Sequence, residues 1–132
     1  MSLRTLSLSL ALLAGLSGVA IAAPSADSCL GDLRVTKVVP HRAAVYAGQG
    51  TYEKLVGARL FVPAAPGLTA EWLHAQLARR AGADSPATQC PLDVPGSSIK
   101  VQSGGPGFWV SVSARNDADA REILRRAEAL TR

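Results

Sequence analysis

Aromatic residues, histidine and cysteine are all scarce in this chain. Its 132 residues include two Trp, two Tyr, two Phe, two His and two Cys. A zinc or copper site needs about three or four ligands at workable spacing, so no metal site and no other cofactor is predicted. Binding of nucleic acid needs a basic stripe with stacking aromatic side chains. The cations here are scattered, so a nucleic-acid partner is not expected.

Catalytic and phosphate-binding motifs are also missing. After residue 22 there is no Gly-x-Ser-x-Gly turn of the kind that exposes a nucleophilic serine. The glycines of residues 103–107 stand between two expected strands, whereas a phosphate-binding loop opens a helix and usually carries Lys. The sequence therefore predicts no catalytic residue, and a small hydrolase is the least favoured function.

The long apolar run is at the N-terminus. Arg4 precedes an uncharged segment, residues 6–20, and Ala20 and Ala22 match the small residues that signal peptidase reads. This pattern predicts a cleaved secretory signal peptide over residues 1–22 and a periplasmic or extracellular protein. An uncleaved anchor is the alternative, but a span needs about 20 strongly apolar residues. The run is shorter and contains Gly and Ser, so no stable membrane anchor is expected.

Both cysteines, Cys29 and Cys90, follow the expected cleavage site. An even cysteine count in an exported chain indicates a disulfide, and closing such a loop is worth roughly 4 kcal/mol on the chain-entropy model. Redox pairs usually stand as Cys-x-x-Cys, and these two are far apart. Free or metal-binding thiols are the alternative, and Asp27 disfavours a lipid anchor on Cys29.

The chain after the signal peptide has the length of one domain. Residues 23–32 are a short polar leader, and residues 33–132 are expected to form a single α+β domain. Segments in which apolar and polar residues alternate predict strands. They cover residues 33–39, 42–47, 55–62, 99–102 and 108–114. The first is expected to end at Pro40, and the last two form a hairpin.

Two helices are expected. Thr69 is a suitable N-cap for a helix over residues 70–81, with Trp72, Leu73 and Leu77 facing inward. Asn116 caps a final helix with one apolar stripe. Because each helix and the hairpin have one apolar face, the expected fold is an antiparallel sheet with both helices packed on one face. From residue 55 onward, β-α-β-β-α is most of a ferredoxin-like unit. Its last strand is missing, and an N-terminal strand can fill that edge.

One surface stands out as a candidate for interaction. Trp109 falls on the hairpin face opposite Phe108 and Val110. If the helices cover the Phe108 face, Trp109 lies on the open face and can form one patch with Phe61 and the stem of Arg59. An exposed aromatic residue on a sheet is typical of a binding surface. The alternative is that the N-terminal segment covers Trp109.

These observations favour a non-catalytic exported binding module that acts on an envelope protein or a small ligand. The second hypothesis is a periplasmic metal-handling protein that uses His41 and His74, with reduced thiols or with histidine alone. Nothing in the spacing of these residues demands a metal.

Several segments of the chain resemble a group of small exported proteobacterial proteins that have no established activity. These segments are residues 57–64, 67–73, 90–92, 107–110 and 121–127. The resemblance implies export and a single small domain, and it implies no activity.

Overall fold

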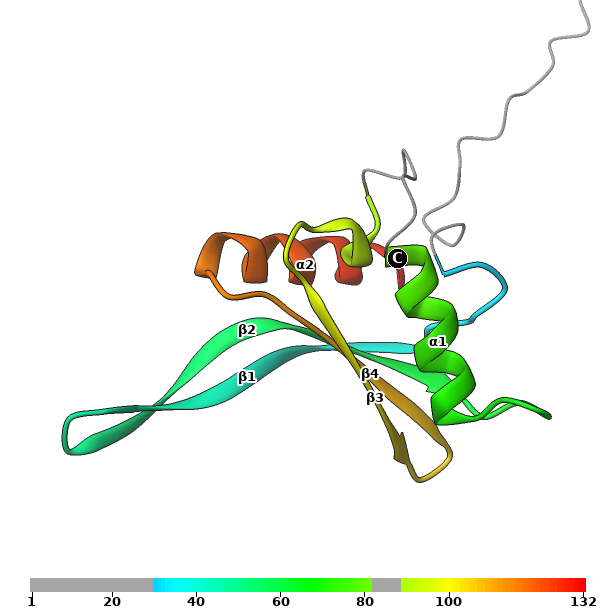
Figure 1. The fold of residues 1–132 in the computed structure, drawn as a ribbon, viewed down its shortest axis with the longest axis horizontal. Helices are drawn as coiled ribbons and strands as arrows, with labels where there is room; N and C mark the ends of the chain where they lie inside the picture. The colour runs from blue at the N-terminus through cyan, green and yellow to red at the C-terminus, as the bar shows by residue number, and fades with distance from the viewer. Residues whose placement is uncertain (1–29, 82–88) are drawn as a thin grey trace, which may run out of the picture.

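The computed structural model describes residues 30–81 and 89–132, which form a four-stranded antiparallel sheet and two helices (Figure 1). The elements are β1 (Lys37–Ala47), β2 (Gly50–Pro63), α1 (Ala70–Ala81), the short 3₁₀ helix η2 (Pro91–Asp93), β3 (Ser98–Gly104), β4 (Gly107–Ser113) and α2 (Asp117–Ala129). Both helices lie on the same face of the sheet. The predicted α+β class, with an antiparallel sheet and both helices on one side, is confirmed.

The strand order is β1-β2-β4-β3, with every neighbouring pair antiparallel. Strand β4 is therefore inserted between β2 and β3, which run parallel to each other and are joined through α1. This split β-α-β order is consistent with a ferredoxin-like unit. The N-terminal strand β1 pairs with the free side of β2, so it fills the edge position as the sequence predicts.

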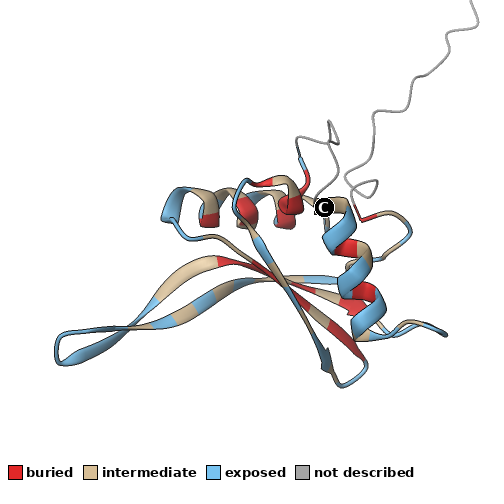
Figure 2. Cartoon of the chain, viewed as in Figure 1, coloured by how far each residue is buried: buried red, intermediate tan, exposed pale blue. Residues whose placement is uncertain are grey.

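The core lies between the sheet and the helices, as the buried positions in Figure 2 show. Register places Leu60 of β2 opposite Val110 of β4, and both are buried on the face toward the helices. The helices contribute Leu73, Leu77 and Ile123, which are also fully buried. Burying an aliphatic side chain of this size stabilises the fold by about 1.5–3 kcal/mol, so this layer fixes which sheet face is covered.

The helix caps follow the local sequence. The Trp72 N–H donates to Thr69 Oγ1 at 3.2 Å, and α1 spans the predicted residues 70–81. The Asp119 N–H donates to Asn116 Oδ1 at 2.8 Å at the start of α2. The predicted inward orientation of Trp72 is wrong, because the residue is 48% exposed. The predicted inward orientation of Leu73 and Leu77 is confirmed, because both are buried.

Strand boundaries differ from the prediction. The two strands predicted over residues 33–39 and 42–47 form one strand, β1, which begins at Lys37 and continues through Pro40 to Ala47. Strand β2 begins at Gly50 instead of residue 55. Pro40 is tolerated because β1 is an edge strand, where a missing N–H need not break the sheet ladder. The register shifts between His41 and Arg42, which leaves a β-bulge in this pair.

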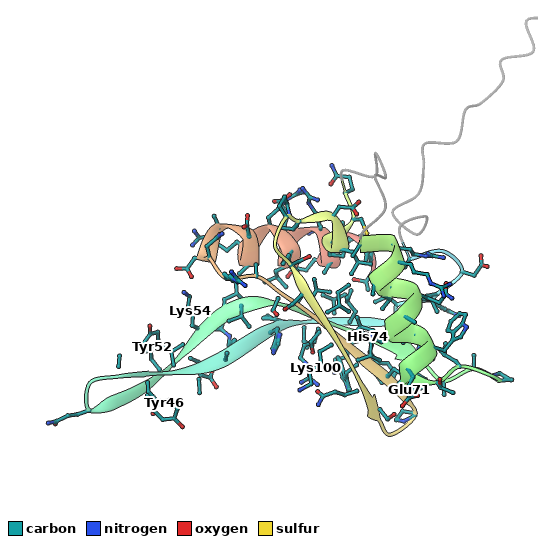
Figure 3. The ribbon with its side chains drawn as sticks, in the orientation of Figure 1. Tyr46, Tyr52, Lys54, Glu71, His74 and Lys100 are labelled. Atoms are coloured by element: carbon teal, nitrogen blue, oxygen red, sulfur yellow. The ribbon has the colours of Figure 1, made fainter. Side chains whose placement is uncertain are left out.

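Beyond the bulge, β1 and β2 project from the sheet as a two-stranded arm, because β4 pairs with β2 only from Gly57 onward. Figure 3 shows Tyr46 and Tyr52 on opposite sides of this arm, where they are 84% and 51% exposed. At the base of the arm, Lys54 Nζ lies 2.8 Å from an oxygen of Asp117 at the start of α2. This ion pair joins the arm to the helical layer.

Candidate functional site

The sheet face away from the helices carries the candidate site. Among the described residues, no helix or strand covers this face. The residues before β1 that the structure describes contribute Leu30, Leu33 and Val35 to the core on the helix side. This part of the N-terminal segment therefore does not cover Trp109, and the rest of the leader lies outside the described residues. We call this surface the open face.

Three side chains that the sequence singled out meet on the open face. Phe61 of β2 stands directly opposite Trp109 of β4, with ring centroids 5.0 Å apart and planes tilted by 59°. The guanidinium carbon of Arg59 lies 4.9 Å from the Trp109 ring centroid, within cation–π distance. We call Arg59, Phe61 and Trp109 the aromatic stack. Their association follows from the β2–β4 register.

The Trp109 ring also reaches the neighbouring strand. A Cβ added to Gly104 of β3 would lie 2.5 Å from Trp109 Cδ1, so the ring lies over this glycine. The aromatic stack thus bridges β2, β4 and β3. Contacts with the two flanking strands hold the indole at a defined place on the open face and limit its exposure.

A polar depression of about 530 Å³ adjoins the aromatic stack. All four strands contribute to it. Its lining consists of Pro40, His41, Arg42, Glu53, Arg59, Ser98, Lys100, Gln102, Ser111 and Ser113. Three of these residues are permanently positive and one is a carboxylate, so we call the depression the basic hollow.

The cations of the basic hollow are not neutralised by neighbours. Arg42, Arg59 and Lys100 form no ion pair with any residue of the ranges 30–81 and 89–132. Figure 3 shows Lys100 on β3, whereas the two arginines come from β1 and β2. Three cations against the single carboxylate of Glu53 leave the hollow with an excess of positive charge, which raises the local potential and attracts an anion.

His41 is the titratable group of the hollow. Its Nδ1 atom is shielded from solvent and has no hydrogen-bond partner in the described part of the chain. Burial lowers the pKa of His41 below its ordinary value of 6.5, and the charges of Arg59 and Lys100 lower it further. The imidazole is therefore neutral at neutral pH.

Hydroxyl groups line the rest of the hollow. Ser98 Oγ and Ser113 Oγ are 2.9 Å apart and share a hydrogen bond, and Ser111 is only 5% exposed. Within the described residues, no hydrogen bond links His41 to any of these serines. A serine hydrolase needs a base in hydrogen-bond reach of its nucleophile, and this arrangement does not provide one.

The two histidines of the metal hypothesis are not brought together. His41 lines the basic hollow on the open face, whereas His74 is exposed on α1, in the helical layer on the other face of the sheet (Figure 3). Within the described residues, no three His, Cys, Asp or Glu side chains are grouped closely enough to hold a metal ion. The geometry gives the metal hypothesis no site there.

Cys90 lies next to η2 and is 3% exposed, packed in the core. Its carbonyl oxygen accepts a hydrogen bond of 3.1 Å from Arg126 Nη1 of α2. Cys29 and the expected signal peptide, residues 1–22, lie outside the described residues. The Cys29–Cys90 disulfide and the cleavage site therefore stay predictions.

Most of the basic hollow was not predicted from the sequence. Lys100 and Gln102 lie in the alternating segment of residues 99–102, which predicts a strand and no site, and Arg42 had no predicted role. One signal was present: Ser111 and Ser113 alternate with apolar residues on the same side as Trp109. The cations could not be assigned to one site without the strand order, because they lie on three strands.

Comparison with protein-family models, curated proteins and solved structures gives no significant match. The resemblance to small exported proteobacterial proteins therefore stays a prediction. In the described segments, neither helix has the length and apolar character needed to cross a membrane.

Proposed function

We propose that this protein is a non-catalytic, exported binding module that holds an envelope protein or a small ligand on the open face of its sheet. The observation that carries the proposal is the joint placement of the aromatic stack and the basic hollow on that face. Export is inferred from the signal-peptide pattern of residues 1–22.

A solvated polar face is the ordinary condition of a sheet packed on one side, so polarity alone would not indicate binding. Two features distinguish this face. Trp and Arg are among the residue types enriched at the energetic centres of interfaces, and here Trp109 and Arg59 are in contact. Beside them lies a concave surface with an excess of positive charge. Concavity, aromatic area and charge together support a binding role.

The arrangement of His41 supports the non-catalytic part of the proposal. General base catalysis needs a side chain within about 2.6–3.2 Å of the group it deprotonates. His41 forms no hydrogen bond with a serine or a carboxylate of the described residues. The hollow is thus equipped to attract a charged group and lacks an activated nucleophile.

Site-specific photo-crosslinking in the cells that produce the protein tests the proposal. A crosslinking amino acid replaces Gln102, which is exposed and opposite Trp109 in the β3–β4 register. The matched control replaces Glu128, which is exposed on α2 in the helical layer. We expect a discrete adduct from position 102, none from position 128, and loss of the adduct when Trp109→Ala is added.

A folded Trp109→Ala protein is required for this comparison, and its far-UV circular dichroism checks that. Adducts of equal yield from both positions, or an adduct from position 102 that Trp109→Ala leaves unchanged, would remove the open face as the binding surface.

A further inference from the structure

We propose that the basic hollow binds a phosphate-type oxyanion between Arg42, Arg59 and Lys100, and that protonation of His41 strengthens this binding. The inference rests on the proposed function, since it names the ligand chemistry of the same open face. The aromatic stack and the overall charge of the chain do not by themselves imply an oxyanion ligand.

Convergent positive charge is the first support. Arg42, Arg59 and Lys100 come from β1, β2 and β3 and line one depression, in which Glu53 is the carboxylate among the lining residues. None of the three cations is in an ion pair with another described residue. An anion entering the hollow would therefore meet three cations that are not engaged in ion pairs with described residues and that outnumber the one carboxylate of the lining, Glu53.

The donor types are the second support. Arg presents a planar fork of N–H groups that matches two oxygens of a phosphate, whereas Lys acts as a compact point charge. The guanidinium of Arg59 is held against the Trp109 ring at 4.9 Å. The Arg59 side chain is therefore partly ordered in the free protein and loses less conformational entropy when a ligand binds. The hydroxyls of Ser98 and Ser113 and the amide of Gln102 add neutral donors.

The size of the hollow indicates more than a bare ion. Its volume of about 530 Å³ lies within the range of roughly 300–1,000 Å³ that small-molecule sites show. A phosphate group attached to a larger body, either a soluble phosphorylated compound or a lipid headgroup, would use this space. The shared chemistry of both sources is the oxyanion.

His41 couples the site to pH. The charged groups that face it are Arg42 from β1, Glu53 and Arg59 from β2, and Lys100 from β3. Without an anion, burial and two of these cations hold the pKa of His41 below 6.5. A bound oxyanion favours the imidazolium form, so binding takes up a proton and becomes tighter as pH falls.

The first test is a titration of the ¹⁵N-labelled mature protein with inorganic phosphate, followed by NMR. We expect saturable shifts of backbone amides in the hollow, such as Ser111, with a dissociation constant on the order of millimolar. Lys100→Gln should weaken binding about tenfold. The matched control, Lys37→Gln, removes the same charge from β1 outside the hollow and should leave the constant within about twofold. Absence of saturable shifts, or equal weakening by both variants, would overturn the site.

The second test uses sulfate, whose charge is constant over the range studied. Between about pH 8 and about pH 5.5, the affinity of the native protein should rise by about fivefold. His41→Asn should remove this rise while keeping the affinity at the higher pH. A rise that persists in His41→Asn would refute the role of the imidazole.

Vesicles separate the two sources of phosphate. A headgroup ligand predicts that vesicles of phosphatidylglycerol retain the protein and that vesicles of phosphatidylcholine do not. Lys100→Gln should then abolish retention, whereas Lys37→Gln should not. If inorganic phosphate binds at Lys100 and no vesicle does, the ligand is soluble. If neither binds while the Gln102 crosslink still depends on Trp109, this inference fails and the proposed function survives.

Discussion

Replacing Trp109 by Leu separates what the indole contributes to folding from what it contributes to binding. The ring contacts Phe61 with centroids 5.0 Å apart and Arg59 at 4.9 Å. An aromatic pair is worth about 0.5–1.5 kcal/mol beyond its burial, and an exposed cation–π contact about 0.5–1 kcal/mol. Trp109→Leu should therefore lower the free energy of unfolding by roughly 1–2.5 kcal/mol, while the core on the opposite face remains intact.

A double-mutant cycle isolates the pair. Urea unfolding followed by far-UV circular dichroism is measured for Trp109→Leu, Phe61→Leu and the double variant, with the dependence on urea expected to stay constant. The coupling energy between positions 61 and 109 should be about 0.5–1.5 kcal/mol. In a small domain, the loss in Trp109→Leu should also lower Tm by roughly 5–15 °C.

Two results would refute this reasoning. Additive losses, with coupling below about 0.3 kcal/mol, would mean that the rings do not interact in solution. A loss above about 4 kcal/mol in Trp109→Leu would put the indole among core residues. It would then be a structural residue and not part of a binding surface.

Two further predictions concern stability and charge. Gly57 lies at the bulge with φ 157°, and a Cβ added there would collide with the Val112 carbonyl oxygen. Gly57→Ala should therefore lower the free energy of unfolding in urea by about 3 kcal/mol. Gly50→Ala, where an added Cβ makes only ordinary contacts, should lower it by less than about 1 kcal/mol. Equal losses would refute the steric argument. Hydrogen bonds from Arg125 and Arg126 hold the pKa of Glu122 at about 2, so its stabilising effect is complete above about pH 4.5 and is lost as pH falls through about 2. A ¹³C titration of the carboxyl with a midpoint near 4.5 would contradict this pairing.

Local signals in the sequence were sufficient for the helices. A hydroxyl or amide cap, followed by a stripe of apolar residues, predicted α1 to its terminal residues, because capping bonds form between residues three apart. The orientation of Trp72 was wrong, since helical spacing places it near the boundary of the apolar stripe. Packing of Leu73 and Leu77 against the sheet decided which residues turn inward.

Strand ends were less predictable because their limits depend on partners. Pro40 and the glycines around residue 50 indicate breaks when read alone. An edge strand tolerates Pro40, and mutual pairing extends β1 and β2 into the arm. Tyr46 falls in the predicted strand over residues 42–47, but Tyr52 lies before the predicted start of the next strand. Their position on a projecting hairpin therefore depends on the pairing of β1 with β2.

By itself, the sequence determined the α+β class, both helices and the face on which Trp109 lies. These features depend on the repeat of apolar residues, every two positions in a strand and every 3.6 in a helix, and on helix caps. Such signals operate within a few positions along the chain. Only the tertiary structure decided that Arg42, Arg59, Lys100 and His41 surround one hollow. They come from three strands, and the order β1-β2-β4-β3 with its register sets their separation. That arrangement is selected by burial on the helix side of the sheet, so the basic hollow follows from core packing on the other face.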